Sequence, residues 1–277
     1  MTRILKPSNS FQKQIIAYFA IMQFPFSLQE IRAIDKRAAW VALGSVFCLV
    51  GIRFFGNAEH VKSLNGIFQV AGLSSLYDLI FQKLFREVHS SFWQMAYWAI
   101  VTLFFYLIVP MIIIKKVFKQ SLREFGLKQK GMFDYSAVYL SALALILPVV
   151  VMVSFSPAFR ATYPFYFPVD RAEMFPYFFS WECLYLLQFF GLEFFFRGFM
   201  IHGLKDKLGI YSVLVMTIPY CMIHFGKPLP ECVGSIGAGL FLGMMSYKTG
   251  SVWMGAFLHM AVAISMDVLS LWHRGYF

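Results

Sequence analysis

The sequence has few charged residues for its length. Asp, Glu, Lys and Arg make up 14% of the 277 residues, whereas hydrophobic residues make up 59%. Because a soluble domain carries about 25% charged residues, this composition excludes an ordinary water-soluble fold. The apolar segments also lack the period-two alternation of an outer-membrane β-barrel. The composition therefore predicts an all-α membrane protein.

The sequence also has few cysteines and no feature of a cleaved leader. Its four cysteines lie in or beside apolar segments and form no CxxC pair, so neither a disulfide framework nor a zinc finger is indicated. The start, MTRILKPSNSFQKQ, lacks a compact apolar region followed by a small-residue cleavage site. We therefore expect the first apolar segments to remain in the mature protein.

The sequence is instead rich in long apolar segments. A helix needs roughly 20 residues to cross the hydrocarbon core. The segments that approach this length predict a polytopic transmembrane helical bundle of about seven spans, at residues 38–56, 92–114, 132–156, 176–203, 210–225, 232–247 and 251–272. Residues 64–86 carry Asp78 and two serines, which fits an amphipathic or re-entrant helix better than a span.

Basic residues predict the orientation of the chain. The net charge is +10, but the basic residues lie between apolar segments, where they match lipid headgroups, so we expect the bilayer as partner and no nucleic acid. Six Lys and Arg precede the first span and six more lie in KKVFKQSLREFGLKQK, which predicts a cytoplasmic N-terminus. We divide the chain into an N-terminal cytoplasmic or interfacial segment (1–36), an N-terminal transmembrane region (37–119) and a C-terminal transmembrane core (120–277).

Ionisable residues inside the spans are the candidates for function, because such residues are costly in a membrane and usually face a cavity. They gather in the C-terminal half: Glu182, Glu193, Arg197, His224, His259 and Asp267. Glu193 and Arg197 are four residues apart and share a helix face, so a purely structural ion pair explains them as well as catalysis does. Two histidines in other spans favour one polar cavity.

Helix geometry ranks the remaining residues. Glu182 lies about three turns or 16 Å before Glu193 on the same face, so we expect it to line the approach and bind substrate. His202, nine residues after Glu193, falls on the opposite face near the helix end, which predicts an interfacial position. Asp267 lies about 80° round the helix from His259 and about 12 Å along it, so direct contact is not expected.

The chemistry of this set favours attack by water. A carboxylate with imidazoles can activate water and stabilise an oxyanion. No GxSxG elbow or cysteine nucleophile motif is present. One Glu and two His could also hold zinc, but HExxH is absent, so we predict no metal and no cofactor. Glu231, after the prolines of KPLPE, is expected to be a solvated or helix-start carboxylate.

At these residues the sequence resembles the CAAX prenyl protease and bacteriocin-processing family of intramembrane glutamic endopeptidases, whose motifs are EExxxR, FxxxH and HxxxN. The corresponding segments are EFFFRGF from Glu193, YCMIH from Tyr220, and HMAVA from His259. The similarity covers roughly residues 120–272. HFGKPLPE and SVWMGAFLH also look like bacterial members, which implies an integral protein of a bacterial inner (plasma) membrane.

Three positions depart from the family pattern. The first glutamate, which the family uses to activate water, is Leu192, and the asparagine after the last histidine is Ala263. Tyr220 stands in place of phenylalanine and adds a hydroxyl to a substrate-binding position. Either Glu193 acts as the base in a variant site or the chain is a non-proteolytic relative.

The resemblance implies an intramembrane glutamic-type endopeptidase that hydrolyses membrane-anchored or prenyl-like peptides. In this hypothesis Glu193 and His224 activate water, His259 stabilises the oxyanion and Arg197 holds Glu193. We expect the Glu193 carboxylate and both histidine rings to line one buried cavity, with Leu192 pointing elsewhere. The alternative is a non-catalytic membrane protein of the same fold that binds a partner or lipid in the cavity, and a proton-coupled transporter is a third hypothesis.

Overall fold

The computed structural model describes residues 32–277, and this part of the chain is built from helices with no β-strand. Six helical segments are long and apolar enough to cross a membrane: Lys36–Phe55, Ser90–Phe118, Ser136–Ser154, Arg171–Leu208, Leu229–Thr249 and Trp253–His273. The prediction of an all-α polytopic bundle is confirmed. Most of the predicted 1–36 segment lies outside the described residues.

The predicted spans correspond closely to the helices. The first span is α3 (Lys36–Phe55). The second is a continuous run of α6 (Ser90–Leu103), η2 (Phe104–Ile108), α7 (Val109–Ile112) and η3 (Ile113–Phe118), and the third is α8 (Ser136–Ser154). The fourth span runs through α10 (Tyr177–Glu193), η6 (Phe194–Met200) and α11 (Ile201–Leu208). It is followed by α12 (Tyr211–Met222), α13 (Leu229–Thr249) and α14 (Trp253–His273). The predicted fifth span, 210–225, is the apolar helix α12, whose 12 residues are fewer than the roughly 20 needed to cross alone.

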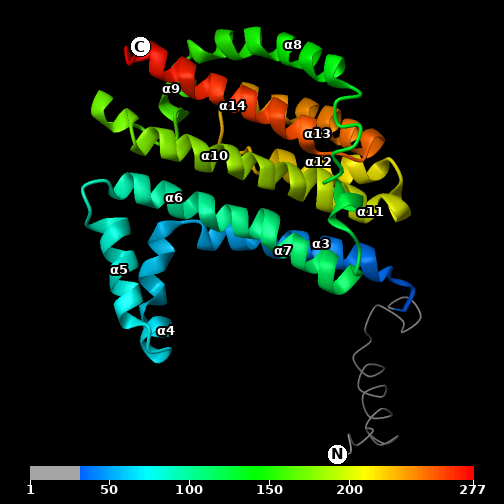
Figure 1. Ribbon diagram of the computed structural model, residues 1–277, viewed down its shortest axis with the longest axis horizontal. Coiled ribbons are helices and arrows are strands. Elements are labelled where there is room, and N and C mark those ends of the chain that lie inside the picture. Colours follow the sequence, from blue (N-terminus) through cyan, green and yellow to red (C-terminus); the bar gives the residue numbers. More distant parts are fainter. Residues whose placement is uncertain (1–31) are drawn as a thin grey trace, which may run out of the picture.

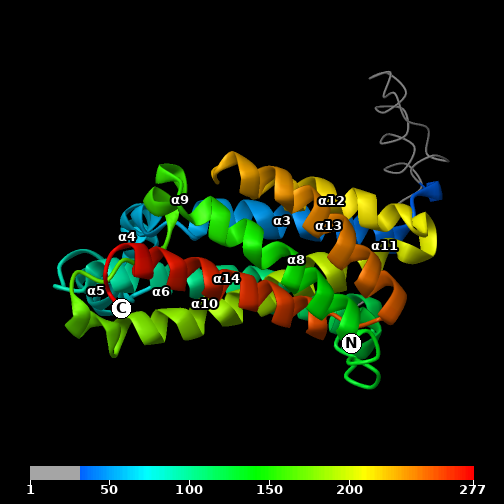
Figure 2. The same cartoon turned by 90° about the horizontal axis from the view of Figure 1, so that it is seen from above.

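The helix that carries Glu193 lies at the centre of the bundle. Figure 1 shows the long helices side by side, with α10 between α14 and α8 on one side and α6 and α3 on the other, and Figure 2 shows α10 running alongside α14. In the most apolar stretch of this span 72% of the residues are buried, against 11–39% in the other five. A central span can hold ionisable groups away from lipid.

The middle of this span is a π-helix, η6, with the sequence FFFRGFM. All seven of its residues are buried, and its phenylalanines form the main core with apolar residues of η2, η3, α11 and α12. Gly198 lets the loop before α8 approach closely, because a Cβ there would lie 2.6 Å from the carbonyl oxygen of Phe125. The π-helical turn is therefore enclosed by protein. Turns of this kind are frequently found at functional sites.

The predicted amphipathic segment, 64–86, forms two short helices, α4 (Asn65–Val70) and α5 (Ser74–Phe85), which project from one end of the bundle (Figure 1). The chain reverses at Gly72, whose φ of 71° favours glycine. Val70 and Leu79 are exposed on this hairpin, so it adds apolar surface outside the bundle.

Candidate active site

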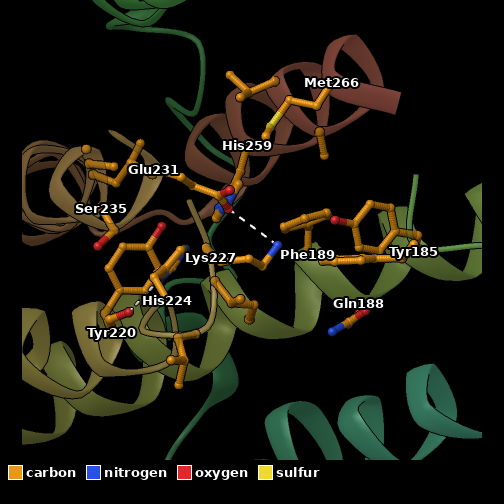
Figure 3. Close-up of a pocket in the computed structure, with 18 of the residues that line it drawn as sticks. Tyr185, Gln188, Phe189, Tyr220, His224, Lys227, Glu231, Ser235, His259 and Met266 are labelled. Atoms are coloured by element: carbon orange, nitrogen blue, oxygen red, sulfur yellow. Dashed lines mark hydrogen bonds and ion pairs between the residues drawn. The ribbon is translucent and has the colours of Figure 1, made fainter. Parts of the chain in front are cut away.

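A cavity of about 1250 Å³ opens among the helices of the C-terminal half. Its walls come mainly from α8, α10, α12, α13 and α14, with the ends of α3 and α6 closing one side. Most lining residues are apolar, and the polar ones include His224, His259 and Tyr220 (Figure 3). The two histidines, which come from separate predicted spans, therefore share one cavity.

Glu193 stands behind the cavity wall. Its side chain is completely buried, with Oε1 3.1 Å from Nη1 of Arg197 and 2.9 Å from Nδ1 of His259. The other oxygen, Oε2, has no hydrogen-bond partner among residues 32–277 and faces Gly255, where a Cβ would lie only 3.1 Å away. The carboxylate is thus enclosed between α10 and α14 by its two cationic or hydrogen-bonding partners and by backbone.

Arg197 is fully buried as well, and Tyr220 covers it. Its guanidinium lies 3.8 Å from the centroid of the Tyr220 ring, a cation–π distance. Nη2 also lies 3.5 Å from the carbonyl oxygen of Ala238. Arg197 therefore neutralises Glu193 while the tyrosine ring separates the pair from the cavity.

His259 connects this buried pair to the cavity. Its side chain is 15% exposed, its ring packs 4.5 Å from that of Phe189, and it lines the cavity. Because Nδ1 donates to the Glu193 carboxylate, the imidazole keeps Nε2 for a group in the cavity. A carboxylate that fixes the tautomer of a histidine in this way makes the second nitrogen a proton acceptor.

His224 lies in the turn after α12. Its Nδ1 donates to the carbonyl oxygen of Tyr220 at 2.7 Å, which again leaves Nε2 as the acceptor. The ring of Tyr220 lies 4.8 Å from His224 and 6.4 Å from His259, edge-on to both. Tyr220 therefore lies close to both imidazoles.

Two features of the expected geometry are wrong. Leu192 lines the cavity instead of pointing away from it, and the Glu193 carboxylate does not line it. The reason is that successive residues of a helix point about 100° apart, so only one of the two adjacent positions can face the cavity, and here it is the leucine. Ala263 also lines the cavity, so both family positions that have lost their polar group face its interior.

The remaining candidates lie elsewhere. Glu182 is absent from the cavity lining of the described chain, and its main charged neighbour is Asp267. His202 is 1% exposed and lies 3.1 Å from Ser246 Oγ, so its side chain faces α13 inside the bundle, and its depth relative to the membrane stays a prediction. The π-helix accounts for this, because its i→i+5 bonding places an extra residue in the turn between Glu193 and His202.

A second polar group in the cavity was not anticipated. Tyr163, Lys227 and Glu231 all line it. Glu231 opens α13, as its position after two prolines indicates, but its side chain is 22% exposed and turns into the cavity instead of into open solvent (Figure 3). The only sequence signal was the HFGKPLPE segment, and it does not reveal that the loop after α9 (Pro157–Thr162) supplies a tyrosine.

The donor set does not suggest a metal centre. Within residues 32–277 no three His, Cys, Asp or Glu side chains are grouped as metal ligands. Glu193 and His259 are bonded to each other, and Arg197 already supplies a positive charge at the carboxylate. A cation held by the same oxygen would stand next to the guanidinium, which is unfavourable.

Comparison with known families covers the part of the chain that carries the site. Residues 174–265 match the model described as type II CAAX prenyl endopeptidase Rce1-like. The matched segment contains Glu193, Arg197, His224 and His259, and it confirms the resemblance seen in the motifs. No curated protein and no solved structure matches the chain.

Proposed function

We propose that this integral membrane protein, whose residues 174–265 match a CAAX-type family of membrane proteases, is an intramembrane endopeptidase. One observation carries the proposal: two imidazoles line a single cavity, and a buried carboxylate holds one of them. Family-level similarity supports a protease. The reaction and the roles of the residues are inferred from the geometry.

The geometry favours His259, instead of Glu193, as the general base. Glu193 is completely buried: its Oε1 contacts Arg197 and His259 and its Oε2 faces the backbone of Gly255, so the carboxylate is not open to a substrate water. Nε2 of His259 takes a proton from water while the water oxygen attacks the peptide carbonyl carbon. The proton then passes to the leaving amine as the C–N bond breaks, so the imidazole ends neutral.

Glu193 and Arg197 act behind the base. The carboxylate holds the His259 tautomer and stabilises the imidazolium that forms, as the aspartate does in a serine-protease triad. Arg197 keeps the carboxylate charged inside the bundle. His224, with Nε2 free, is the second imidazole available to orient the water or protonate the leaving group.

The cavity suits a substrate with a large apolar part. Its volume of about 1250 Å³ exceeds that of most small-molecule pockets, at about 300–1,000 Å³. The apolar lining is supplied largely by α8 and by the later helices, including Val149, Val153, Met222, Ile223, Val262 and Met266. We propose membrane-anchored or prenyl-like peptides as substrates, with Tyr220 in contact with them.

We propose a cytoplasmic N-terminus in a bacterial inner membrane, and the distribution of basic residues supports this orientation. The start of α3 and the end of α11 lie together, because Arg37 pairs with Asp206 and Lys207 with Asp35. Figure 1 shows the loop between η3 and α8, which carries four of the six basic residues of KKVFKQSLREFGLKQK, at this same end of the bundle. A positively charged end of the bundle is typical of the cytoplasmic side.

A non-catalytic binding protein is the second candidate, and two residues favour it. Leu192 and Ala263 line the cavity at the positions where the family has glutamate and asparagine. A cavity that has lost both groups keeps its shape and apolar character, which are sufficient for binding a lipid or a lipid-modified partner.

Cleavage in a defined membrane separates the two candidates. The purified protein is reconstituted in vesicles with a panel of membrane-anchored and prenylated peptides, and products are identified by mass spectrometry. We expect the parent protein to cleave, and His259→Ala to lose about 10²- to 10⁴-fold in rate. His60→Ala, which changes an exposed histidine outside the cavity, is the matched control. Binding of the panel without any cleavage would favour the non-catalytic candidate.

A further inference from the structure

A compact polar cluster lines the same cavity as the two histidines. The Tyr163 hydroxyl lies 2.7 and 2.6 Å from the two carboxylate oxygens of Glu231. Nζ of Lys227 donates to the same hydroxyl at 2.7 Å and lies 3.4 Å from Oε1 of Glu231. Three side chains from the loop after α9, the turn after α12 and the start of α13 thus fix one another.

Lys227 is the cationic member of this cluster. Its ammonium lies 4.0 Å from the centroid of the Phe165 ring and 4.6 Å from that of Tyr163. Figure 3 shows its side chain extending into the cavity among His224, Glu231 and Phe189. Burial lowers the pKa of Lys227, and Glu231 opposes this by favouring the charged form.

The rest of the lining has few cationic hydrogen-bond donors. Lys227 and Arg53 are the only Lys or Arg side chains among the described lining residues, and Arg53 is in the last turn of α3. The hydroxyl of Ser235 already donates to the carbonyl oxygen of Cys232. Ala263 has no donor at the position where the family has an asparagine.

Peptide hydrolysis needs such a donor. When water attacks, the carbonyl oxygen becomes negatively charged, and an oriented donor in a water-poor site lowers the energy of that state more than that of the substrate. An ammonium has three N–H groups, and the contacts with Tyr163 and Glu231 account for two of those of Lys227. One N–H remains for a group in the cavity.

We propose that Lys227 is a catalytic residue of the endopeptidase, donating a hydrogen bond to the oxyanion that forms when water attacks the peptide carbonyl. Glu231 and Tyr163 are positioning residues that hold the ammonium in the cavity. This inference rests on the proposed function. The turn after α12 would thereby supply the hydrogen-bond donor that Ala263 lacks.

Kinetics of matched variants test the role. Loss of one oxyanion donor costs about 10²- to 10³-fold in kcat, so Lys227→Met should lose this much with little change in KM. Lys227→Arg, which keeps the charge, should recover part of the rate. Lys248→Met removes a lysine near the end of α13 that does not line the cavity, so its kcat should equal that of the parent.

Binding provides a readout that does not depend on turnover. A peptide phosphinate carries the tetrahedral, anionic shape of the intermediate, whereas the corresponding peptide amide does not. Lys227→Met should weaken phosphinate binding by about the same 10²-fold or more, with amide binding nearly unchanged. Glu231→Gln and Tyr163→Phe should show smaller losses in the same direction, because they loosen the ammonium without removing it.

The outcomes separate the two proposals. If the parent cleaves but Lys227→Met keeps its kcat and its phosphinate affinity, the role of Lys227 is overturned and the protease assignment stands. If Gln188→Leu causes the selective loss in place of Lys227→Met, the donor is the glutamine that lines the cavity, and the proposal is likewise overturned. If the parent cleaves nothing in the panel, the proposed function and the catalytic role fail together.

Discussion

Two carboxylates buried between α10 and α14 differ in what surrounds them. Glu193 is held by Arg197 and by His259, which extends to the cavity. Asp267, on α14, is 1% exposed, and neither of its oxygens has a hydrogen-bond partner within the described part of the chain. Its main charged neighbour is a second acid, Glu182.

Comparing Glu193 with Asp267 shows which kind of buried acid belongs to a functional site. Burial alone does not distinguish the two positions, because both side chains are removed from solvent. The partners distinguish them: one acid has a dedicated cation and a histidine directed to a cavity, and the other has neither. Functional assignment in a membrane span therefore depends on the neighbours of an ionisable group more than on its depth.

The largest expected effect comes from removing the cation of the first site. Arg197→Met leaves Glu193 buried beside an apolar chain, and breaking a buried pair in this way costs about 3–5 kcal/mol. We expect a large drop in the unfolding temperature measured in detergent, together with loss of activity. Adding Glu193→Gln to this variant should recover part of the stability, because the uncompensated charge is gone. If Arg197→Met is as stable as the parent, Arg197 is not what compensates the charge of Glu193.

Removing the carboxylate itself tests its catalytic importance. Glu193→Gln keeps the size of the side chain but cannot stabilise an imidazolium on His259, so we expect cleavage to fall by about 10²- to 10⁴-fold. The double variant with His259→Ala should be hardly slower than His259→Ala alone, since groups that act as one unit are non-additive. Additive losses in this cycle would show that the two residues act separately.

The second acid should be far more tolerant. Asp267→Asn replaces a buried acid that has no cation bonded to it with an uncharged side chain of similar size, so we expect the free energy of unfolding to stay within about 1 kcal/mol of that of the parent. Cleavage should stay close to the parental rate. Glu182→Gln, the neighbour of Asp267, serves as the paired control. Loss of cleavage comparable to that of Glu193→Gln would extend the functional site to this pair.

The smallest effect is expected from chelation. If a metal ion compensated Glu193, removing it would abolish activity, but Arg197 already supplies the positive charge. We expect EDTA or 1,10-phenanthroline to leave the cleavage rate unchanged and elemental analysis to find no stoichiometric zinc. One zinc per chain, lost together with activity and restored by adding zinc, would contradict this expectation.

Much of the fold follows from the sequence, because hydrocarbon imposes a simple rule. A span must be a helix of about 20 apolar residues, so hydropathy locates each helix to within a few residues. Residue identity likewise indicates Glu193, Arg197 and the two histidines, since such groups are rare at this depth. The structure brings these four residues together, but their catalytic roles await the experiments above.

Sequence could not decide which of two adjacent residues faces the cavity. Leu192 and Glu193 differ by one position, and their directions depend on how α10 is rotated against α14 and α12. It also could not join Tyr163 to Lys227 and Glu231, whose contacts span 64 and 68 residues along the chain. These contacts depend on the packing of a loop against a helix start, and no local pattern encodes that.

The wide turn of η6 has a consequence for how this span tolerates length changes. Ser246 of α13 donates to the carbonyl oxygen of Arg197 at 3.1 Å, so a neighbouring helix supplies part of the hydrogen bonding at this turn. If the same residues took ordinary winding, everything after them would rotate by about 100° relative to Glu193, and His202 would leave Ser246. Because the wide turn holds one residue more than an ordinary turn, deleting one phenylalanine of FFFRGFM would allow ordinary winding with nearly the same phase between the two halves of the helix. We therefore expect a one-residue deletion to be tolerated better in η6 than in α10 or α11.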